Sequence, residues 1–251
     1  MTLPLAVTVT AKKPGRFLEV AKAKARAWGL PFVERAEKTP LPLEVADAFL
    51  VLGGEGWTLS DAEGSLTFTP GMARVRIKRI ALGQQEDDVI LRLCELKAGD
   101  SVLDATLGLA GDAQVMAYKV GPTGRVIGVE ASLAMFALVS EGLRAMGSAI
   151  DVRHGSSLEV LRAMPTGSVD CVVVDPMFDR PKKSSPAFEM LRRFAVHEPL
   201  ERETLEEAQR VARRWVVVKG GRFGREFARL GLVPLPMPRS ASLMWARLPG
   251  G

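Results

Sequence analysis

The sequence predicts an α/β protein with a Rossmann-like, mostly parallel sheet that ends in an antiparallel hairpin, preceded by a small α/β module. The first observation is that short apolar, β-branched runs alternate with helical patterns from about residue 96 onward, which is typical of a parallel sheet covered on both faces. The second is that hydrophobic residues make up 47% of the 251 residues and charged residues 25%, so the chain can bury such a core.

Residues 1–80 predict a small basic N-terminal α/β module. They carry 12 Lys and Arg against 8 Asp and Glu, whereas the remaining residues carry 22 against 21. One amphipathic helix is predicted over residues 16–30, and Pro31 ends it. Short strands are predicted at residues 5–11, 48–53, 56–59 and 65–69.

Residues 81–251 predict a second domain of alternating strands and helices. The predicted strands are residues 101–105, 125–130, 150–154, 169–175 and 215–219. The predicted helices are residues 86–96, 112–120, 133–146, 158–163, 203–212 and 223–230. We expect residues 232–238 and 242–248 to form the final hairpin.

Composition restricts the location and the chemistry. Only two cysteines, Cys94 and Cys171, and two histidines are present, so we expect no disulfide, no metal site and a reducing, cytoplasmic location. No apolar run reaches the roughly 18–20 residues of a membrane helix. The N-terminus alternates like a strand and lacks the basic region of a signal peptide, so no membrane partner is expected.

The first candidate site segment follows the strand at 101–105. It contains Asp104, Thr106, Gly108, Gly111 and Asp112. Ligands of doubly wound sheets bind at the carboxyl ends of strands, where glycines let the backbone approach a ligand. The alternative is an ordinary turn in which the glycines only relieve crowding.

Two further segments follow the next two strands. Glu130 ends a strand, where a carboxylate can accept both hydroxyls of a ribose. Its alternative role is to cap the following helix, for which Ser132 is equally suited. Ser156 and Ser157 can reach an adenine edge, cap a helix, or do both. Together with the glycine loop, Glu130 indicates a nucleoside pocket that suits S-adenosylmethionine (SAM) and NAD alike.

The segment Asp175-Pro176-Met177-Phe178 follows an apolar strand directly. Asp175 can accept a hydrogen bond from an exocyclic amine, and Pro176 removes a backbone donor. Phe178 offers a ring on which a base can stack. A strand ending in a common Asp-Pro turn is the alternative, but at this place in the fold we favour a site for an acceptor base.

These segments resemble the class I SAM-dependent methyltransferases, and within them the RsmJ-like family. The residues that carry this resemblance are Asp104-Ala105-Thr106, Gly108, Gly111, Asp112, Glu130, Ser156-Ser157 and Asp175-Pro176-Met177-Phe178. The chain is also similar to the YpiP-like branch, at Arg76-Ile77-Lys78-Arg79, at residues 104–110 and at Arg210-Val211-Ala212-Arg213-Arg214. The resemblance covers most of residues 70–225. Ala110 stands where the RsmJ-like pattern has glycine.

The resemblance implies a class I methyltransferase domain at 81–251 that binds SAM and methylates RNA, as RsmJ-like proteins do at guanosine N2 of ribosomal RNA. Asp104, Thr106, Gly108, Gly111 and Asp112 would surround the methionine part of SAM. Glu130 would bind the ribose, Ser156 and Ser157 the adenine, and Asp175, Pro176, Met177 and Phe178 the target base.

Basic residues form three groups. Arg74, Arg76 and Lys78 alternate and would share one face of a strand. Arg180, Lys182 and Lys183 follow the Asp175 motif, and we predict that they contact substrate phosphates. Others crowd the C-terminal part: Arg210, Arg213, Arg214, Lys219, Arg222, Arg225 and Arg229. A solvated surface is the alternative for each.

Three other functions stay open at this stage. The acceptor could be DNA, protein or a small molecule. An NAD-dependent oxidoreductase also fits a glycine loop with Glu130, although the loop is not G-x-G-x-x-G. A non-catalytic module that binds SAM or RNA is the third, and the intact Asp175 motif argues against it.

Overall fold

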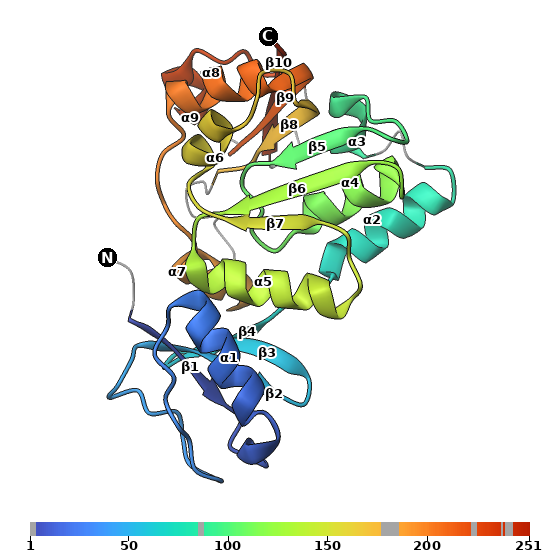
Figure 1. Cartoon of the computed structure of the whole chain (residues 1–251). Coiled ribbons are helices and arrows are strands. Elements are labelled where there is room, and N and C mark those ends of the chain that lie inside the picture. Colours follow the sequence, from blue (N-terminus) through green and yellow to red (C-terminus); the bar gives the residue numbers. More distant parts are fainter. Residues whose placement is uncertain (1–3, 85–87, 177–185, 222–224, 237, 239–242) are drawn as a thin grey trace. The chain divides into compact units, whose positions relative to one another are not determined.

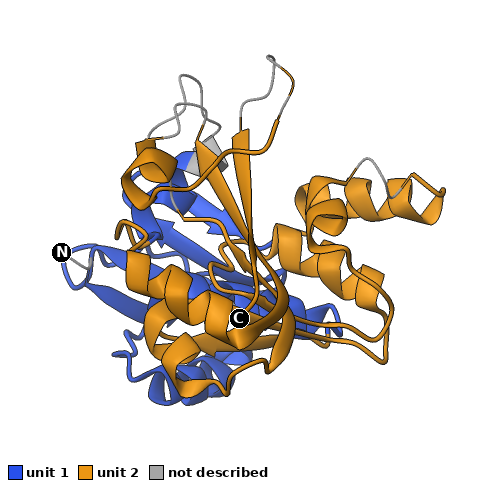
Figure 2. Cartoon of the chain, turned by 90° about the horizontal axis from the view of Figure 1, so that it is seen from above, with its two compact units in different colours: residues 1–69, 132–148, 183–195 blue, residues 70–131, 149–182, 196–251 orange. Residues whose placement is uncertain are grey.

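The computed structural model describes residues 4–84, 88–176, 186–221, 225–236, 238 and 243–251 (Figure 1). Contacts divide the chain into two compact units (Figure 2). Unit 1 comprises Met1–Thr69, Ser132–Ser148 and Lys183–Ala195; unit 2 comprises Pro70–Ala131, Ala149–Lys182 and Val196–Gly251. Because these units interleave along the chain, a contiguous division at residue 80 stays a prediction.

The sheet of unit 2 has the strand order β10-β9-β8-β5-β6-β7. Its strands are β5 (Ser101–Asp104), β6 (Arg125–Glu130), β7 (Asp151–His154), β8 (Val169–Val174), β9 (Ala212–Gly221) and β10 (Leu243–Pro249). All neighbours are parallel except β9 and β10. This confirms the predicted mostly parallel sheet with an antiparallel end. The order reverses beside β5, so the topological switch point lies between β5 and β8.

Helices cover the sheet of unit 2 as two separate groups (Figure 1). One group is α2 (Gly71–Ala81), α3 (Val89–Cys94) and α4 (Gly111–Val120), in which α4 packs on β5 and β6. The other is α6 (Ser157–Ala163), α8 (Arg202–Val211) and α9 (Arg225–Leu230), in which α8 packs on β8 and β9. The apolar strand residues Leu103, Val172 and Val216 are fully buried, which accounts for the continuous apolar runs in the sequence.

Unit 1 is built on the sheet β1-β2-β3-β4. Its strands are β1 (Leu5–Val9), β2 (Ala48–Gly53), β3 (Gly56–Asp61) and β4 (Ser65–Thr67). Its helices are α1 (Leu18–Trp28), α5 (Leu133–Ala145) and α7 (Pro186–Phe194), preceded by the short 3-10 turn η1 (Pro14–Arg16). Helix α5 packs on β2 and β3, and an ion pair between Lys24 and Glu141 joins it to α1. A Cβ at Gly142 would lie 2.1 Å from the Phe68 ring, so only glycine allows this approach.

One predicted element is wrong, and one conditional placement does not apply. Residues 71–81 form helix α2, because most of these residues favour a helix, so Arg74, Arg76 and Lys78 do not share the face that they would share on a strand. Residues 232–236 form no strand: Pro234 and Pro236 lack the N–H that a ladder needs. A single bond, from the Leu235 amide to the Trp245 carbonyl at 2.7 Å, joins this segment to β10, which pairs with β9 instead.

No helix in the described part of the chain combines the length and the apolar character needed to cross a membrane.

Candidate functional site

The candidate residues of unit 2 gather at one edge of its sheet. Asp104 ends β5, Glu130 ends β6 and Asp175 directly follows β8. These three strands are parallel, so their carboxyl ends meet at the same edge, on both sides of the switch point. The prediction that these carboxylates share one region of the fold is therefore confirmed.

The loop after β5 lies tightly against β6. The Leu107 amide donates to the Val129 carbonyl at 2.8 Å, and the Leu107 side chain covers Gly128. A Cβ at Gly128 would come within 2.5 Å of the Leu107 side chain. The glycine inside β6 thus allows the close approach that positions the loop.

The same loop has free space beside the backbone of its glycines. Gly108 has a left-handed φ of 51°, and a Cβ at Gly108 or at Gly111 would meet nothing within 4 Å. Ala110, the departure from the RsmJ-like pattern, is buried and also left-handed, with φ 57°. A left-handed backbone costs a non-glycine residue about 1–2 kcal/mol, which explains why glycine suits this position.

Glu130 is 8% exposed, and the loop holds its carboxylate. The Gly108 amide donates to Oε2 of Glu130 at 3.0 Å. The N-cap of α5 is Ser132, whose hydroxyl accepts from the Met135 amide at 3.4 Å. The capping role therefore belongs to Ser132, and the Glu130 carboxylate faces the loop.

The two serines after β7 differ in their contacts. Ser156 is the N-cap residue of α6, but its hydroxyl makes no capping hydrogen bond. The Ser157 hydroxyl donates to the Ala105 carbonyl and so ties α6 to the loop after β5. The expected side-chain cap is therefore absent at Ser156, and the Ser157 hydroxyl instead joins the start of α6 to the loop after β5.

Four acidic side chains, those of Asp88, Asp104, Asp112 and Asp175, and two cations form the centre of the site. The Lys219 ammonium pairs with Oδ2 of Asp175 and lies 3.6 Å from Oδ2 of Asp112. Arg76 of α2 pairs with Asp112 from the other side. It also donates to both carboxylate oxygens of Asp88, at 2.8 and 3.1 Å, and Asp88 caps α3.

Asp104 is the most buried carboxylate of this group, with 2% of its surface exposed. Burial and the nearby Asp112 carboxylate raise the pKa of Asp104 to about 8, against the opposing effects of the Thr106 amide and Lys219. The Thr106 amide donates to Oδ1 of Asp104 at 3.2 Å. At neutral pH this carboxyl therefore holds its proton.

Asp175 and Lys219 form a strongly interacting pair. Burial raises the pKa of Asp175, and the Lys219 ammonium opposes that rise. Burial lowers the pKa of Lys219, but the carboxylates of Asp175 and Asp112 overcome this and raise it. The Asp175 amide donates to the Thr106 hydroxyl at 2.6 Å, which fixes the backbone at the start of the motif.

The remainder of the predicted acceptor region is only partly visible. Pro176, which follows Asp175 in the chain, is half-buried. Met177, Phe178, Arg180, Lys182 and Lys183 lie outside the described residues.

Arg76 and Lys219 are two site residues that the sequence did not reveal. From the sequence both were grouped with basic residues outside the site, whereas in the structure they lie among the carboxylates. A signal for Lys219 was present: the apolar runs of β8 and β9 end in Asp175 and Lys219, and Val174 is in register with Val218. Parallel pairing therefore places Asp175 and Lys219 side by side.

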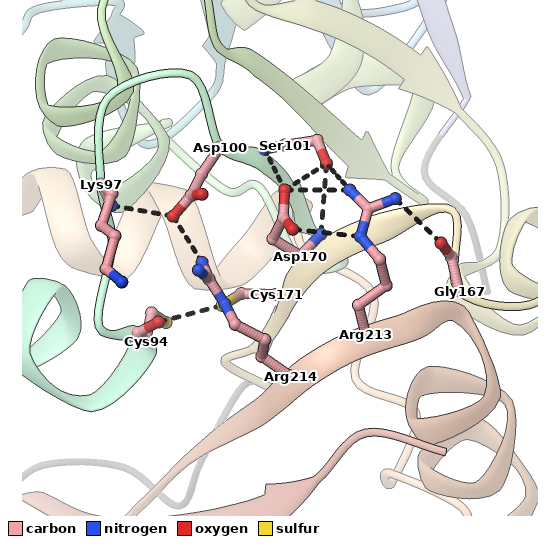
Figure 3. Close-up of polar contacts among 9 residues, drawn as sticks. All are labelled: Cys94, Lys97, Asp100, Ser101, Gly167, Asp170, Cys171, Arg213 and Arg214. Carbon is pink, nitrogen blue, oxygen red and sulfur yellow. Dashed lines mark hydrogen bonds and ion pairs between the residues drawn. The ribbon is translucent and has the colours of Figure 1, made fainter.

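Several C-terminal arginines form hydrogen bonds and ion pairs within the protein. Figure 3 shows Arg213 beside Asp170 and Ser101, and Arg214 beside Asp100. These contacts lie at the amino ends of β5, β8 and β9, the edge opposite Asp104 and Asp175. Arg210 likewise donates to the carbonyls of Leu161 and Met164. Arg210 and Arg214 are half-buried and Arg213 is exposed, and all three pair with neighbouring groups of the protein.

Within the described ranges, no three His, Cys, Asp or Glu side chains are grouped so that they could hold a metal ion. Both cysteines are buried free thiols.

The chain is similar to several known proteins. The family model described as "Putative SAM-dependent methyltransferase" matches residues 65–229. The uncharacterized protein YpiP of Bacillus subtilis (strain 168) is 32% identical over 226 residues, which cover 85% of this chain and 87% of that protein. Ribosomal RNA small subunit methyltransferase J of Alteromonas mediterranea is 28% identical over 207 residues, covering 76% of this chain and 77% of that protein. Among solved structures, TrmN of Thermus thermophilus aligns with a TM-score of 0.48 and 19% identity over 98% of this chain and 71% of that chain.

A mostly parallel sheet with an antiparallel end strand, and carboxylates at the ends of β5, β6 and β8, define a class I SAM-dependent methyltransferase. The cofactor is SAM, which sets aside the NAD-dependent alternative. The chain belongs to the SAM-dependent methyltransferase family whose model spans residues 65–229, and it is related to YpiP and to ribosomal RNA small subunit methyltransferase J.

Proposed function

We propose that this methyltransferase modifies an exocyclic base amine of RNA, in the first place N2 of a guanosine in ribosomal RNA. The observation that carries the proposal is the Asp175 carboxylate beside the switch point. Lys219 binds its Oδ2, and Thr106 fixes its backbone amide. Its Oδ1 accepts no hydrogen bond from a described residue, so it is suited to accept one from an acceptor amine. A relative at 28% identity is named as a ribosomal RNA methyltransferase, which favours RNA as the acceptor.

The residues around the loop after β5 fit SAM. Open backbone at Gly108 and Gly111 leaves room for the methionine part, with Asp104, Thr106 and Asp112 around it. Glu130, oriented by Gly108, would bind the ribose hydroxyls. We assign the adenine side to the segment that contains Ser156 and Ser157, because the Ser157 hydroxyl already binds the loop after β5.

Bound SAM supplies a methyl group that is already activated by its sulfonium. The task of the protein is therefore to position the acceptor nitrogen in line with that methyl group. An exocyclic amine is a poor nucleophile, because its lone pair is delocalised into the ring. Hydrogen bonds from the amine to Asp175 and to a carbonyl beside Pro176 would favour a pyramidal nitrogen. As the new N–C bond forms, the bond between that methyl group and sulfur would break with its electron pair staying on sulfur, which leaves S-adenosylhomocysteine, and the nitrogen would lose one proton.

The acceptor base would lie against Met177 and Phe178, with the RNA backbone along Arg180, Lys182 and Lys183. These roles follow from the position of the residues directly after Asp175-Pro176 in the chain. We also propose a cytoplasmic location, since both cysteines are free thiols and ribosomal RNA is found there.

Two measurements test the proposed function. Calorimetric titration with S-adenosylhomocysteine and, separately, with NAD should show micromolar binding of the first only. Ribosomal RNA from a deletion strain, incubated with the enzyme and isotopically labelled SAM, should then yield a labelled nucleoside methylated on an exocyclic nitrogen. Label recovered only in protein, DNA or small molecules would refute the RNA acceptor.

Asp175→Asn tests the role of the carboxylate itself, because the amide has nearly the same shape without the charge. We expect this variant to lose methyl transfer to RNA while it retains most of its affinity for S-adenosylhomocysteine. Loss of both properties together would instead assign Asp175 to cofactor binding or to folding.

A further inference from the structure

Lys219 lies between two parts of the site that have different tasks. Its ammonium pairs with Asp175 on the acceptor side and lies 3.6 Å from Asp112, in the first turn of α4, on the cofactor side. Only 18% of the Lys219 side chain is exposed, and the ammonium also lies 5.7 Å from the ring centroid of Trp245 in β10. Lys219 is therefore half-buried, and the carboxylates around it stabilise its charged form.

The charges that face this pair come from several elements. Asp112 of α4 contributes negative charge, whereas the buried Asp104 of β5 holds its proton at neutral pH. Arg76 of α2 reaches Asp112 but not Asp175. Among the described residues, Lys219 is therefore the cation that directly binds the Asp175 carboxylate. Without it, burial and the nearby Asp112 would both favour the protonated form of Asp175.

We propose that Lys219 is a positioning residue of methyl transfer: it holds Asp175 as a carboxylate and occupies Oδ2, so that Oδ1 points to the acceptor amine. This inference rests on the proposed role of Asp175 as the acceptor of that hydrogen bond. Lys219 itself gives up no proton, because the carboxylates around it stabilise its charged form. The reaction consumes no charge on Lys219, and the proton released by the acceptor nitrogen leaves through Asp175 or directly to water.

The geometry of the Lys219 ammonium explains why a lysine suits this position. An ammonium can donate to Asp175 and still attract Asp112, because its three donors point in different directions. It thus links the start of the Asp175 motif to the first turn of α4. Parallel pairing of β8 and β9 supplies the register, since Val174 lies opposite Val218.

The test follows the titration of Asp175 by NMR, in protein carrying carboxyl-¹³C aspartate and free of cofactor and RNA. Asp175→Asn identifies the signal by its disappearance. In Lys219→Met we expect the midpoint of Asp175 to rise by about 1–3 pH units, the range by which an adjacent cation shifts a carboxyl. Lys219→Gln is the second variant in case Met disturbs folding. Lys97→Met, which removes an exposed lysine, is the matched control and should leave the midpoint unchanged.

Activity on RNA separates positioning from a purely structural role. In Lys219→Met, kcat should fall about 100-fold, with little change in the KM for RNA, and the acidic limb of the pH profile should move upward with the Asp175 midpoint. Lys219→Arg, which keeps the charge, should restore both the midpoint and most of kcat. A midpoint that is the same in wild type, Lys219→Met and Lys219→Gln overturns the inference.

The two proposals fail in different ways. If RNA is not the acceptor, no variant methylates RNA, yet the Asp175 midpoint still responds to Lys219, which supports the pairing and refutes only the acceptor. If RNA is methylated and Lys219→Met works at the wild-type rate with an unchanged pH profile, the acceptor stands and the role of Lys219 is refuted.

Discussion

The backbone amide of Gly108 donates to Oε2 of Glu130 at 3.0 Å, so the loop after β5 orients the carboxylate that ends β6. Both residues lie in the part of the sheet where parallel strands open to a ligand. Under the proposed ribose role, a carboxylate held in this way would lose little further freedom when the ribose binds.

Glu130→Ala should therefore weaken the binding of S-adenosylhomocysteine by about 10–100-fold, because hydrogen bonds to a charged group contribute about 1.5–3 kcal/mol. Calorimetric titration measures this change. Glu159→Ala removes an exposed glutamate from α6 and should leave the affinity unchanged. Equal affinities for wild type and Glu130→Ala would refute the ribose role.

Asp104 predicts an unusual dependence of stability on pH. Its pKa is raised to about 8 in the folded protein, mainly by burial, against about 3.9 in an unfolded chain. Between these values the folded protein holds a proton that the unfolded chain has released. This contribution to stability is therefore complete below about pH 4 and is lost as the pH rises towards 8.

Asp104→Asn removes that titration and keeps an oxygen that can accept the Thr106 amide. Urea unfolding at pH 5, 6, 7 and 8 should show the variant gaining free energy of unfolding relative to the wild type as the pH rises. A difference that is constant over this range would show that Asp104 titrates in the same way in both states.

The strand ends of the site could be predicted from the sequence, and the reason is geometric. Asp104, Glu130 and Asp175 each end an apolar run, and parallel strands bring such ends to one edge. The pattern could not show that Arg76 turns towards Asp112, because alternating basic residues suit an exposed strand as well as a helix. Nor could it show the partner of Lys219, which depends on the pairing of β8 with β9.

The grouping of α5 with unit 1 also lies beyond sequence patterns. Its apolar residues predict a helix, and the helix forms at Leu133–Ala145. Periodicity identifies an apolar face but does not say which sheet that face covers. The assignment of α5 to unit 1 comes from tertiary contacts such as that of Gly142 with Phe68, two residues that lie 74 positions apart in the chain.

The basic residues after Asp175 predict salt-dependent binding of RNA. If Lys182 and Lys183 contact phosphates, affinity falls steeply with salt, and Lys182→Ala/Lys183→Ala lowers the slope of log affinity against log salt by roughly 1–2. Fluorescence anisotropy with a labelled RNA fragment, at several salt concentrations, measures both effects. The exposed Lys97→Ala should keep the wild-type slope. Binding that ignores salt, or no binding, would count against phosphate contacts here.

Asp170 should contribute to stability without affecting the cofactor. It accepts bonds from the Ser101 amide and hydroxyl, both at 2.8 Å, and from Arg213 at 3.0 Å (Figure 3). Burial acts to raise the pKa of Asp170, but Arg213 and Ser101 outweigh it and lower that pKa below its usual range. The stabilisation is thus present above about pH 4 and is lost as the pH falls through the lowered pKa.

At pH 7, Asp170→Asn should reduce the free energy of unfolding by about 1–3 kcal/mol, with an unchanged affinity for S-adenosylhomocysteine. Asp151→Asn, at a more exposed pair with Arg125, should cost less than about 1 kcal/mol, and equal losses in the two variants would refute this ranking.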